Sequence, residues 1–236
     1  MSVRSTFALA GASLALVAAP TTVAAAAGTA SSAAGTTVSV RVEGVKHALL
    51  TPTIVHTHSG SITTGGAPAG TCPATHAAGA LDVATHHRWN GTYSKASGLG
   101  IEVTQILGET DKYSPHGHYW EILINNKSAT AGICDLKLQA GDQLLFAAVP
   151  ATGTVYPLTL SGPSKVTAGK AFTVRVSAYN AKGVAKPVAG VHVSGASKVS
   201  NAHGLVTVTE SHRGTARFTA SGTGYIRSAP LAVKVG

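Results

Sequence analysis

Hydrophobic and polar residues alternate along several short segments of the chain. IEVTQIL, residues 101–107, is a β-rich run that predicts a strand, and in VSVRVEG, residues 38–44, apolar and polar residues alternate. This period of two is typical of a strand with one buried face. Four further β-rich runs predict strands, and Pro52 places the first of them at a sheet edge or bulge; they are LLTPTIVHTHSG, YWEILI, ICDLKL and QLLF, residues 49–60, 119–124, 133–138 and 143–146.

One segment has helical spacing instead. Within residues 77–88, AAGALDVATHHR, the apolar residues Ala77, Leu81 and Ala84 recur at i, i+4 and i+7. His86 and His87 stand at its predicted end, where a histidine partly neutralises the helix dipole. The order strand, strand, helix, several strands predicts an α+β domain.

Beyond residue 150 the pattern changes. Pro150 and Pro157 bracket a predicted linker. Short alternating runs then follow one another, separated by turn residues and without a helical segment; they include AFTVRVSAYN, GLVTVTE and GTARFTAS. Such spacing predicts an immunoglobulin-like β-sandwich. The chain as a whole is therefore predicted to be mainly β, with an α+β domain before the sandwich.

The N-terminal segment has the composition of a secretory signal peptide. Arg4 precedes an apolar run that is too short for a membrane span and that ends in small residues. An uncleaved anchor is the alternative. We expect a secreted or extracellular protein, including one associated with the cell envelope, and no membrane span in the mature chain.

The two cysteines, Cys72 and Cys134, are expected to form a disulfide, because an even pair in an exported chain is usually bridged. Two buried thiols are the alternative.

Asn90 and Asn126 match the glycosylation pattern, but both are interpreted as turn residues.

The charges are unevenly divided. Residues 36–156 contain seven Lys or Arg against eight Asp or Glu, whereas residues 157–236 contain ten against Glu210 alone. An anionic envelope polymer is a candidate partner for this basic half. Scattered, solvated lysines are the alternative interpretation. No aromatic residues are interleaved for base stacking, so nucleic acid is not an expected partner.

The chain lacks the motifs of hydrolases, metalloproteases and nucleotide-binding enzymes. We therefore expect no catalytic residue and a protein that is not an enzyme. Large aromatic side chains are scarce, and we expect a ligand, a small molecule or a surface partner, to contact Trp89, Tyr113, Tyr119 and Trp120.

Histidines supply a second, competing hypothesis. His56 and His58 would share one face of a strand, as would His116 and His118. Two such pairs could bind zinc or copper. No metal site is favoured, because no carboxylate or cysteine is committed beside the pairs.

A family resemblance adds to this interpretation. Residues 37–149 resemble the transcobalamin C-terminal-like family, the domain of unknown function numbered 4430. The resemblance rests most on W-x-I-x-I-N-N-K-x-A followed by G-x-C-D and L-x-x-G-D. It implies a β-grasp-like fold, with strands wrapped around one helix.

Related domains in vitamin B12 carriers form one wall of the cobalamin site, beside a helical barrel. This chain has no room for the barrel, so no cofactor is expected, and cobalamin remains a candidate only through the resemblance. The segment PVAGVHVSGASKVSNAHGLVTVTESHRGTARFTAS is similar to invasin-type bacterial immunoglobulin-like domains, which act as spacers or adhesive modules.

These inferences combine into one predicted organisation: signal peptide 1–27, flexible leader 28–36, β-grasp-like domain 37–150, linker 151–157 and sandwich 158–236. The predicted function is an exported, non-enzymatic binding module with a basic sandwich as spacer or envelope contact. A structural or adhesive surface protein and a histidine-based metal-binding protein are the alternatives. The sequence does not define the oligomeric state.

Overall fold

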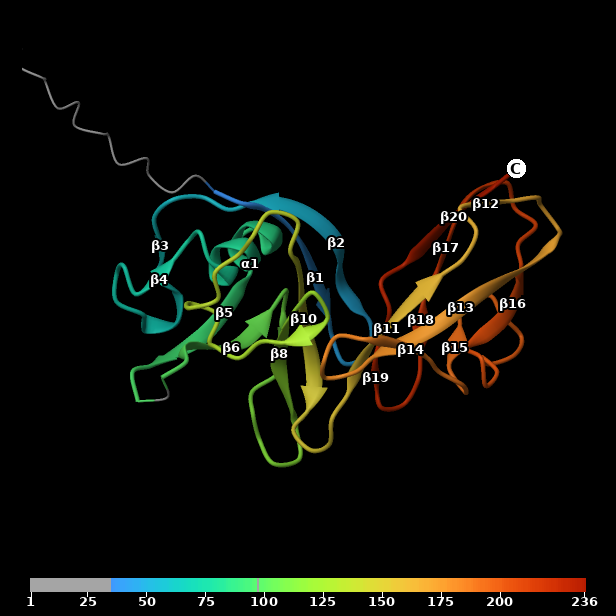
Figure 1. Ribbon diagram of the computed structural model, residues 1–236. Coiled ribbons are helices and arrows are strands. Elements are labelled where there is room, and N and C mark those ends of the chain that lie inside the picture. Colours follow the sequence, from blue (N-terminus) through green and yellow to red (C-terminus); the bar gives the residue numbers. More distant parts are fainter. Residues whose placement is uncertain (1–34, 97) are drawn as a thin grey trace, which may run out of the picture. The chain divides into compact units, whose positions relative to one another are not determined.

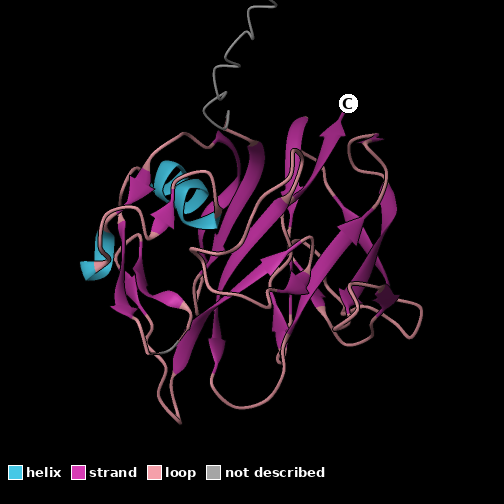
Figure 2. Ribbon diagram, turned by 60° about the vertical axis from the view of Figure 1, so that its left-hand side comes forward, coloured by secondary structure: helices cyan, strands magenta, loops and turns pink. Residues whose placement is uncertain are grey.

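The computed structural model describes residues 35–96 and 98–236, and its elements are mainly strands (Figure 1; Figure 2). The predicted signal peptide and most of the leader lie outside the described residues. Within these residues, no helix combines the length and the apolar character needed to cross a bilayer. The mainly β prediction is confirmed.

The first half of the chain is built on a five-stranded sheet. Its order is β2 (Ala48–His56), β1 (Thr37–Glu43), β10 (Gln143–Pro150), β8 (His118–Ile124) and β9 (Lys127–Ser128). Strands β1 and β10 are parallel, and β2 and β8 flank them in antiparallel register. Strand β2 is at the sheet edge, and Pro52 lies where the register between β1 and β2 shifts, without a paired residue on β1.

Helix α1 (Ala77–Thr85) packs on one face of this sheet. Its Ala77, Ala80 and Leu81 join the same core cluster as Val38, Val40 and Val42 of β1, and all are fully buried. Small alanines allow the helix to approach the sheet closely. Strands wrapped around one helix are the arrangement that the family resemblance implied.

The helix is shorter than predicted. It ends at Thr85 because His86 and His87 both adopt left-handed backbone conformations, with φ of 52° and 61°. The His86 and His87 amides donate to the carbonyls of Val83 and Asp82, which closes the helix end.

A smaller sheet, a pair of two-residue strands and a 3-10 helix complete the first half. The sheet contains β5 (Trp89–Ser94), β6 (Gly100–Ile106) and β7 (Glu109–Thr110). Strands β3 (Ser61–Ile62) and β4 (Cys72–Pro73) pair with each other, and the 3-10 helix η1 (Thr64–Gly66) lies between them in sequence. The strand predicted for residues 133–138 is wrong, because these residues form turns with a single bridge, His76 to Lys137.

The second half forms two larger sheets and a two-stranded pair, which share one core. One contains β14 (Ala185–Pro187), β13 (Ala171–Tyr179), β11 (Tyr156–Ser161), β19 (Tyr225–Ile226) and β16 (Leu205–Thr209). The other contains β12 (Lys165–Val166), β20 (Leu231–Val235) and β17 (Gly214–Phe218), and β15 (His192–Val193) pairs with β18 (Ala220–Ser221).

The sandwich core follows the alternation in the sequence. Val174 and Val176 of β13 are fully buried while Thr173 and Arg175 between and beside them are exposed. Phe172 of β13 and Phe218 of β17 meet edge to face, with ring centroids 5.7 Å apart. These side chains come from the two different sheets, which therefore share one core.

A buried ion cluster lies on the second face of the first-half sheet. Glu43 is only 3% exposed, and its two carboxylate oxygens accept from Arg41 Nη1 at 3.0 Å and Arg227 Nη1 at 2.9 Å. Arg41 Nη1 also donates to the Arg227 carbonyl at 2.9 Å. Burial raises the pKa of Glu43 and lowers the pKa of Arg41, and in each case the opposite charge beside the group counteracts the shift.

The cluster gives a stability prediction. Glu43→Gln leaves two guanidinium groups without a counter-charge, and we expect it to lower the free energy of unfolding by about 3 kcal/mol. Urea denaturation measures this value. The same carboxyl-to-amide change at exposed Glu102 is the control and should change stability by less than about 0.5 kcal/mol. Equal effects of the two changes would contradict the account.

Candidate functional site

The candidate site is a cleft between two strands that each lack a neighbour over part of their length. On β8, strand β9 pairs only with Leu123 and Ile124, which leaves residues 118–121 unpaired on the side away from β10. On β6, strand β7 pairs only with Gln105 and Ile106. Among the described residues, no strand pairs with the remainder of β6 on the side away from β5. Two incomplete sheet edges therefore border the cleft.

The backbone N–H and C=O of Trp120 are directed to the side of β8 that faces away from β10. Ile122 lies two residues further along β8, and its carbonyl accepts from the Ala129 amide at 2.8 Å on the side away from β10. Backbone groups two residues apart in a strand point the same way. The N–H and C=O of Trp120 are therefore directed away from β10, toward a side on which no described strand pairs with them.

The cleft encloses a cavity of about 590 Å³, within the usual range for small-ligand sites. Its lining is mostly apolar and aromatic and comes from β6, β8 and the segments that precede β6, precede β8 and follow β9. It consists of Leu99, Ile101, Glu102, Val103, Tyr113, Tyr119, Trp120, Glu121, Ile122, Ala129, Thr130, Ala131, Gly132 and Ile133. Leu99 and Tyr113 are 49% and 61% exposed. Exposed apolar side chains at the mouth of a cavity are typical of a binding surface.

Trp120 contributes a polar group that has no protein partner. Its side chain is 6% exposed, and the buried indole Nε1 has no hydrogen-bond acceptor among the described residues. A buried N–H without an acceptor costs about 1–3 kcal/mol.

The charged residues of the lining are both acidic. Glu102 of β6 is exposed, and Glu121 of β8 accepts a hydrogen bond from the Ser128 hydroxyl. No lysine, arginine or histidine is among the described lining residues. The electrostatic character of the cleft therefore favours a cationic group.

Beside the cleft, Asp111 follows β7 and is partly buried. Burial raises the pKa of its carboxyl, and the nearby Glu109 raises it further. Burial and then the charge of Glu121 likewise raise the pKa of Tyr119, which keeps this phenol neutral. Tyr119 can therefore act as a hydrogen-bond donor at the cleft.

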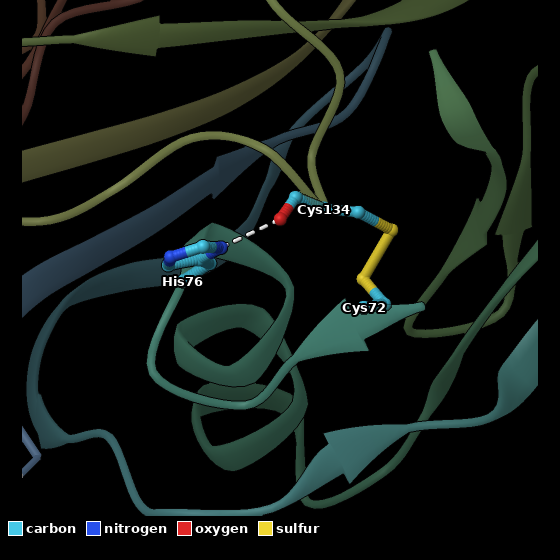
Figure 3. Close-up of a disulfide and its surroundings, with 3 residues drawn as sticks. All are labelled: Cys72, His76 and Cys134. Atoms are coloured by element: carbon cyan, nitrogen blue, oxygen red, sulfur yellow. Dashed lines mark hydrogen bonds between the residues drawn. A yellow bond between two sulfur atoms is a disulfide. The ribbon is translucent and has the colours of Figure 1, made fainter. Parts of the chain in front are cut away.

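The segment that closes the cleft, residues 129–136, is fixed to helix α1 (Figure 3). Cys134 forms the predicted disulfide with Cys72, with Cα atoms 4.5 Å apart. The amides of Ala77 and Ala78 donate to the carbonyls of Leu136 and Ile133 at 3.0 and 3.2 Å. The ring Nδ1 of His76 lies 2.6 Å from the Cys134 carbonyl oxygen.

Gly132 allows this segment to meet the other wall of the cleft. A Cβ atom at Gly132 would lie 1.8 Å from the carbonyl oxygen of Leu99. Only glycine permits this approach, so residue 132 brings the closing segment into contact with the residues that lead into β6.

Three of the four predicted aromatic residues come together at the cleft. The rings of Tyr113 and Tyr119 meet edge to face at 6.1 Å, and Tyr119 and Trp120 are neighbours on β8. Trp89 lies elsewhere, buried beneath the helix end, where its Nε1 donates to Asp82 at 2.9 Å. A ligand-binding role for all four stays a prediction.

The histidines of the metal hypothesis have separate surroundings. Nδ1 of His56 lies 3.0 Å from the Thr37 hydroxyl, and Nδ1 of His58 lies 2.7 Å from the Ser59 carbonyl oxygen. His116 precedes β8 and His118 begins it. Within the described part of the chain, no three His, Cys, Asp or Glu side chains are grouped to hold a metal ion.

The two asparagines differ from each other. Asn126 follows Asn125 in a turn in which both have left-handed backbone angles, as interpreted from the sequence. The turn predicted at Asn90 is wrong, because Asn90 belongs to β5, next to a β-bulge. Its side-chain oxygen accepts from the Thr64 hydroxyl and from the Gly91 amide.

The second half presents a separate basic surface. In the sheet formed by β12, β20 and β17, Lys165 pairs with Lys234, and Lys234 pairs with Thr215. Arg217 lies two residues from Thr215 and so points to the same face. Lys165, Arg217 and Lys234 are all exposed. We call these three residues the basic face.

Two comparisons describe what the chain is similar to. Residues 80–148 match the family model described as "Domain of unknown function (DUF4430)", in agreement with the resemblance in the first half. No curated protein matches the chain. One similar solved structure is described as a "putative metal binding protein" from Ruminococcus gnavus ATCC 29149. It has 12% sequence identity and a TM-score of 0.35 over 50% of this chain and 99% of the other.

Proposed function

We propose that the protein is an exported, non-enzymatic binding protein whose ligand site is the cleft between β6 and β8. The observation that carries the proposal is a cavity of about 590 Å³ bordered by two strand edges that, over part of their length, no described strand pairs with. Preformed cavities with a few unsatisfied polar groups are typical ligand sites.

The lining suggests the chemistry of the ligand. Trp120, Tyr113 and Tyr119 offer aromatic surface, and Glu102 and Glu121 offer negative charge. Cations are attracted to aromatic faces as well as to carboxylates. We infer a ligand with an apolar body and a cationic group.

A second candidate function concerns the sandwich. The basic face supports contact with an anionic polymer of the cell envelope, because three cations share one exposed sheet face. Thr215 and Ala232 are the uncharged residues beside them in register, so the cations on this face have no paired carboxylate within the described sheet. Long-range attraction to a polyanion requires such an arrangement.

The cleft can be tested with a simple amphiphilic cation. Calorimetric titration with benzyltrimethylammonium should give saturable binding, because the probe combines an aromatic ring with a quaternary ammonium group. The double variant Glu102→Gln, Glu121→Gln should weaken binding by about tenfold, from two charge contacts of roughly 0.7 kcal/mol each.

The matched controls separate charge from shape. The neutral isostere neopentylbenzene should bind more weakly than the cation. The variant Glu210→Gln removes one carboxylate from a position outside the cleft and should leave binding unchanged, in contrast to the single variant Glu102→Gln. Absence of binding, or equal weakening by the control variant, would contradict the proposed site.

The basic face can be tested by salt-dependent retention on immobilised dextran sulfate. We expect the triple variant Lys165→Gln, Arg217→Gln, Lys234→Gln to elute at lower salt than the unchanged protein. The variant Lys182→Gln, Lys186→Gln, Lys198→Gln removes equal charge from exposed residues elsewhere in the same half. If both variants shift elution equally, retention depends on net charge and the basic face has no special role.

A further inference from the structure

We propose that the occupant of the cleft is an extended polypeptide strand with alternating basic and apolar side chains, which pairs its backbone with the free edge of β8. The inference rests on the proposed function of the cleft and names the class of ligand. Three features of the cleft carry it: the unpaired backbone, the abrupt ends of the neighbouring strands, and the distribution of side chains on the two edges.

The unpaired backbone belongs to β8 before Ile122. The Ala129 amide donates a hydrogen bond to the Ile122 carbonyl, and β9 pairs with Leu123 and Ile124. The next outward-directed residue toward the start of β8 is Trp120, whose N–H and C=O have no strand partner among the described residues. A sheet edge with free donors and acceptors is a template for another strand.

The neighbouring strands end where an added strand would begin. Strand β9 contains only Lys127 and Ser128. The chain then turns away from β8 and continues as residues 129–136, which hydrogen-bond to the start of helix α1. Strand β7 contains only Glu109 and Thr110, so β6 also loses its neighbour. A peptide strand in the cleft would extend the sheet pairing of β8 beyond the end of β9, and that of β6 beyond the end of β7.

The side chains on both edges are divided in the same way. Trp120 and Ile122 of β8 pack against the first-half core, as do Ile101 and Val103 of β6. Glu121, between Trp120 and Ile122, points to the opposite face of β8. On β6, Glu102 is exposed between two buried neighbours.

This division specifies the sequence pattern of the occupant. Successive side chains of a strand alternate between faces. Every second residue would therefore meet Trp120, Ile122, Ile101 and Val103, which favour apolar groups. The residues between them would meet Glu102 and Glu121, which favour lysine or arginine. A segment such as Lys-Val-Lys-Val-Lys satisfies both requirements.

The experiment uses the acetylated and amidated peptide Lys-Val-Lys-Val-Lys, titrated into the protein by calorimetry. Two analogues carry N-methyl groups on alternate residues, either on the lysines or on the valines, so that each loses the donors along one edge while keeping its side chains. We expect the parent peptide to bind and at least one analogue to bind about tenfold more weakly or worse. The peptide Glu-Val-Glu-Val-Glu should not bind.

Amide hydrogen exchange locates the contact. Bound peptide should slow hydrogen exchange of the Trp120 amide. The Leu123 amide is directed toward β10, so its exchange should not change. If benzyltrimethylammonium binds but both N-methylated analogues bind as the parent does, strand addition is wrong and the proposed site stands. The same conclusion follows if the parent peptide fails to bind. If neither probe binds, the proposed site and the inference both fail.

Discussion

The start of helix α1 is the point on which the cleft depends. The first amides of a helix have no acceptor within it and must be satisfied from outside. His76, the N-cap residue, provides no side-chain cap. The carbonyls of Ile133 and Leu136 take this role for Ala78 and Ala77, and the disulfide holds the same segment against the residues that precede the helix. The closing segment is therefore committed to the helix.

That commitment explains why β8 keeps a free edge. After two paired residues the chain must leave β9 to reach the helix, so it cannot accompany β8 back toward His118. Gly132 then brings the segment against Leu99, at the start of the other incomplete sheet. The cavity is thus the space between two sheets that a single segment ties together at one end. Trp120 lines this space, and its buried indole N–H has no acceptor among the described residues.

Alternation and helical spacing predicted most elements of the fold, including β1, β6, β8, the sandwich strands and the presence of one α-helix, because these depend on local burial. Composition also pointed correctly to the disulfide. Residues 133–138 were mispredicted as a strand because their apolar residues are mostly buried in the core, while the only β-bridge in this described segment is His76 to Lys137. Tyr113, Tyr119 and Trp120 were identified by their scarcity. Glu102 and Glu121 were not predicted as site residues, since their shared position depends on where β7 and β9 end.

The central claim is that β6 and β8 border a cleft through unpaired edges. Cross-strand nuclear Overhauser effects in the free protein test it most directly, because paired antiparallel strands bring backbone atoms within about 5 Å. The account predicts such contacts between β8 and β10 along the whole of β8, and between β8 and β9 only at Leu123 and Ile124. It predicts none of the kind expected for a paired ladder between residues 101–103 and 119–121. A continuous ladder between these two segments would contradict it.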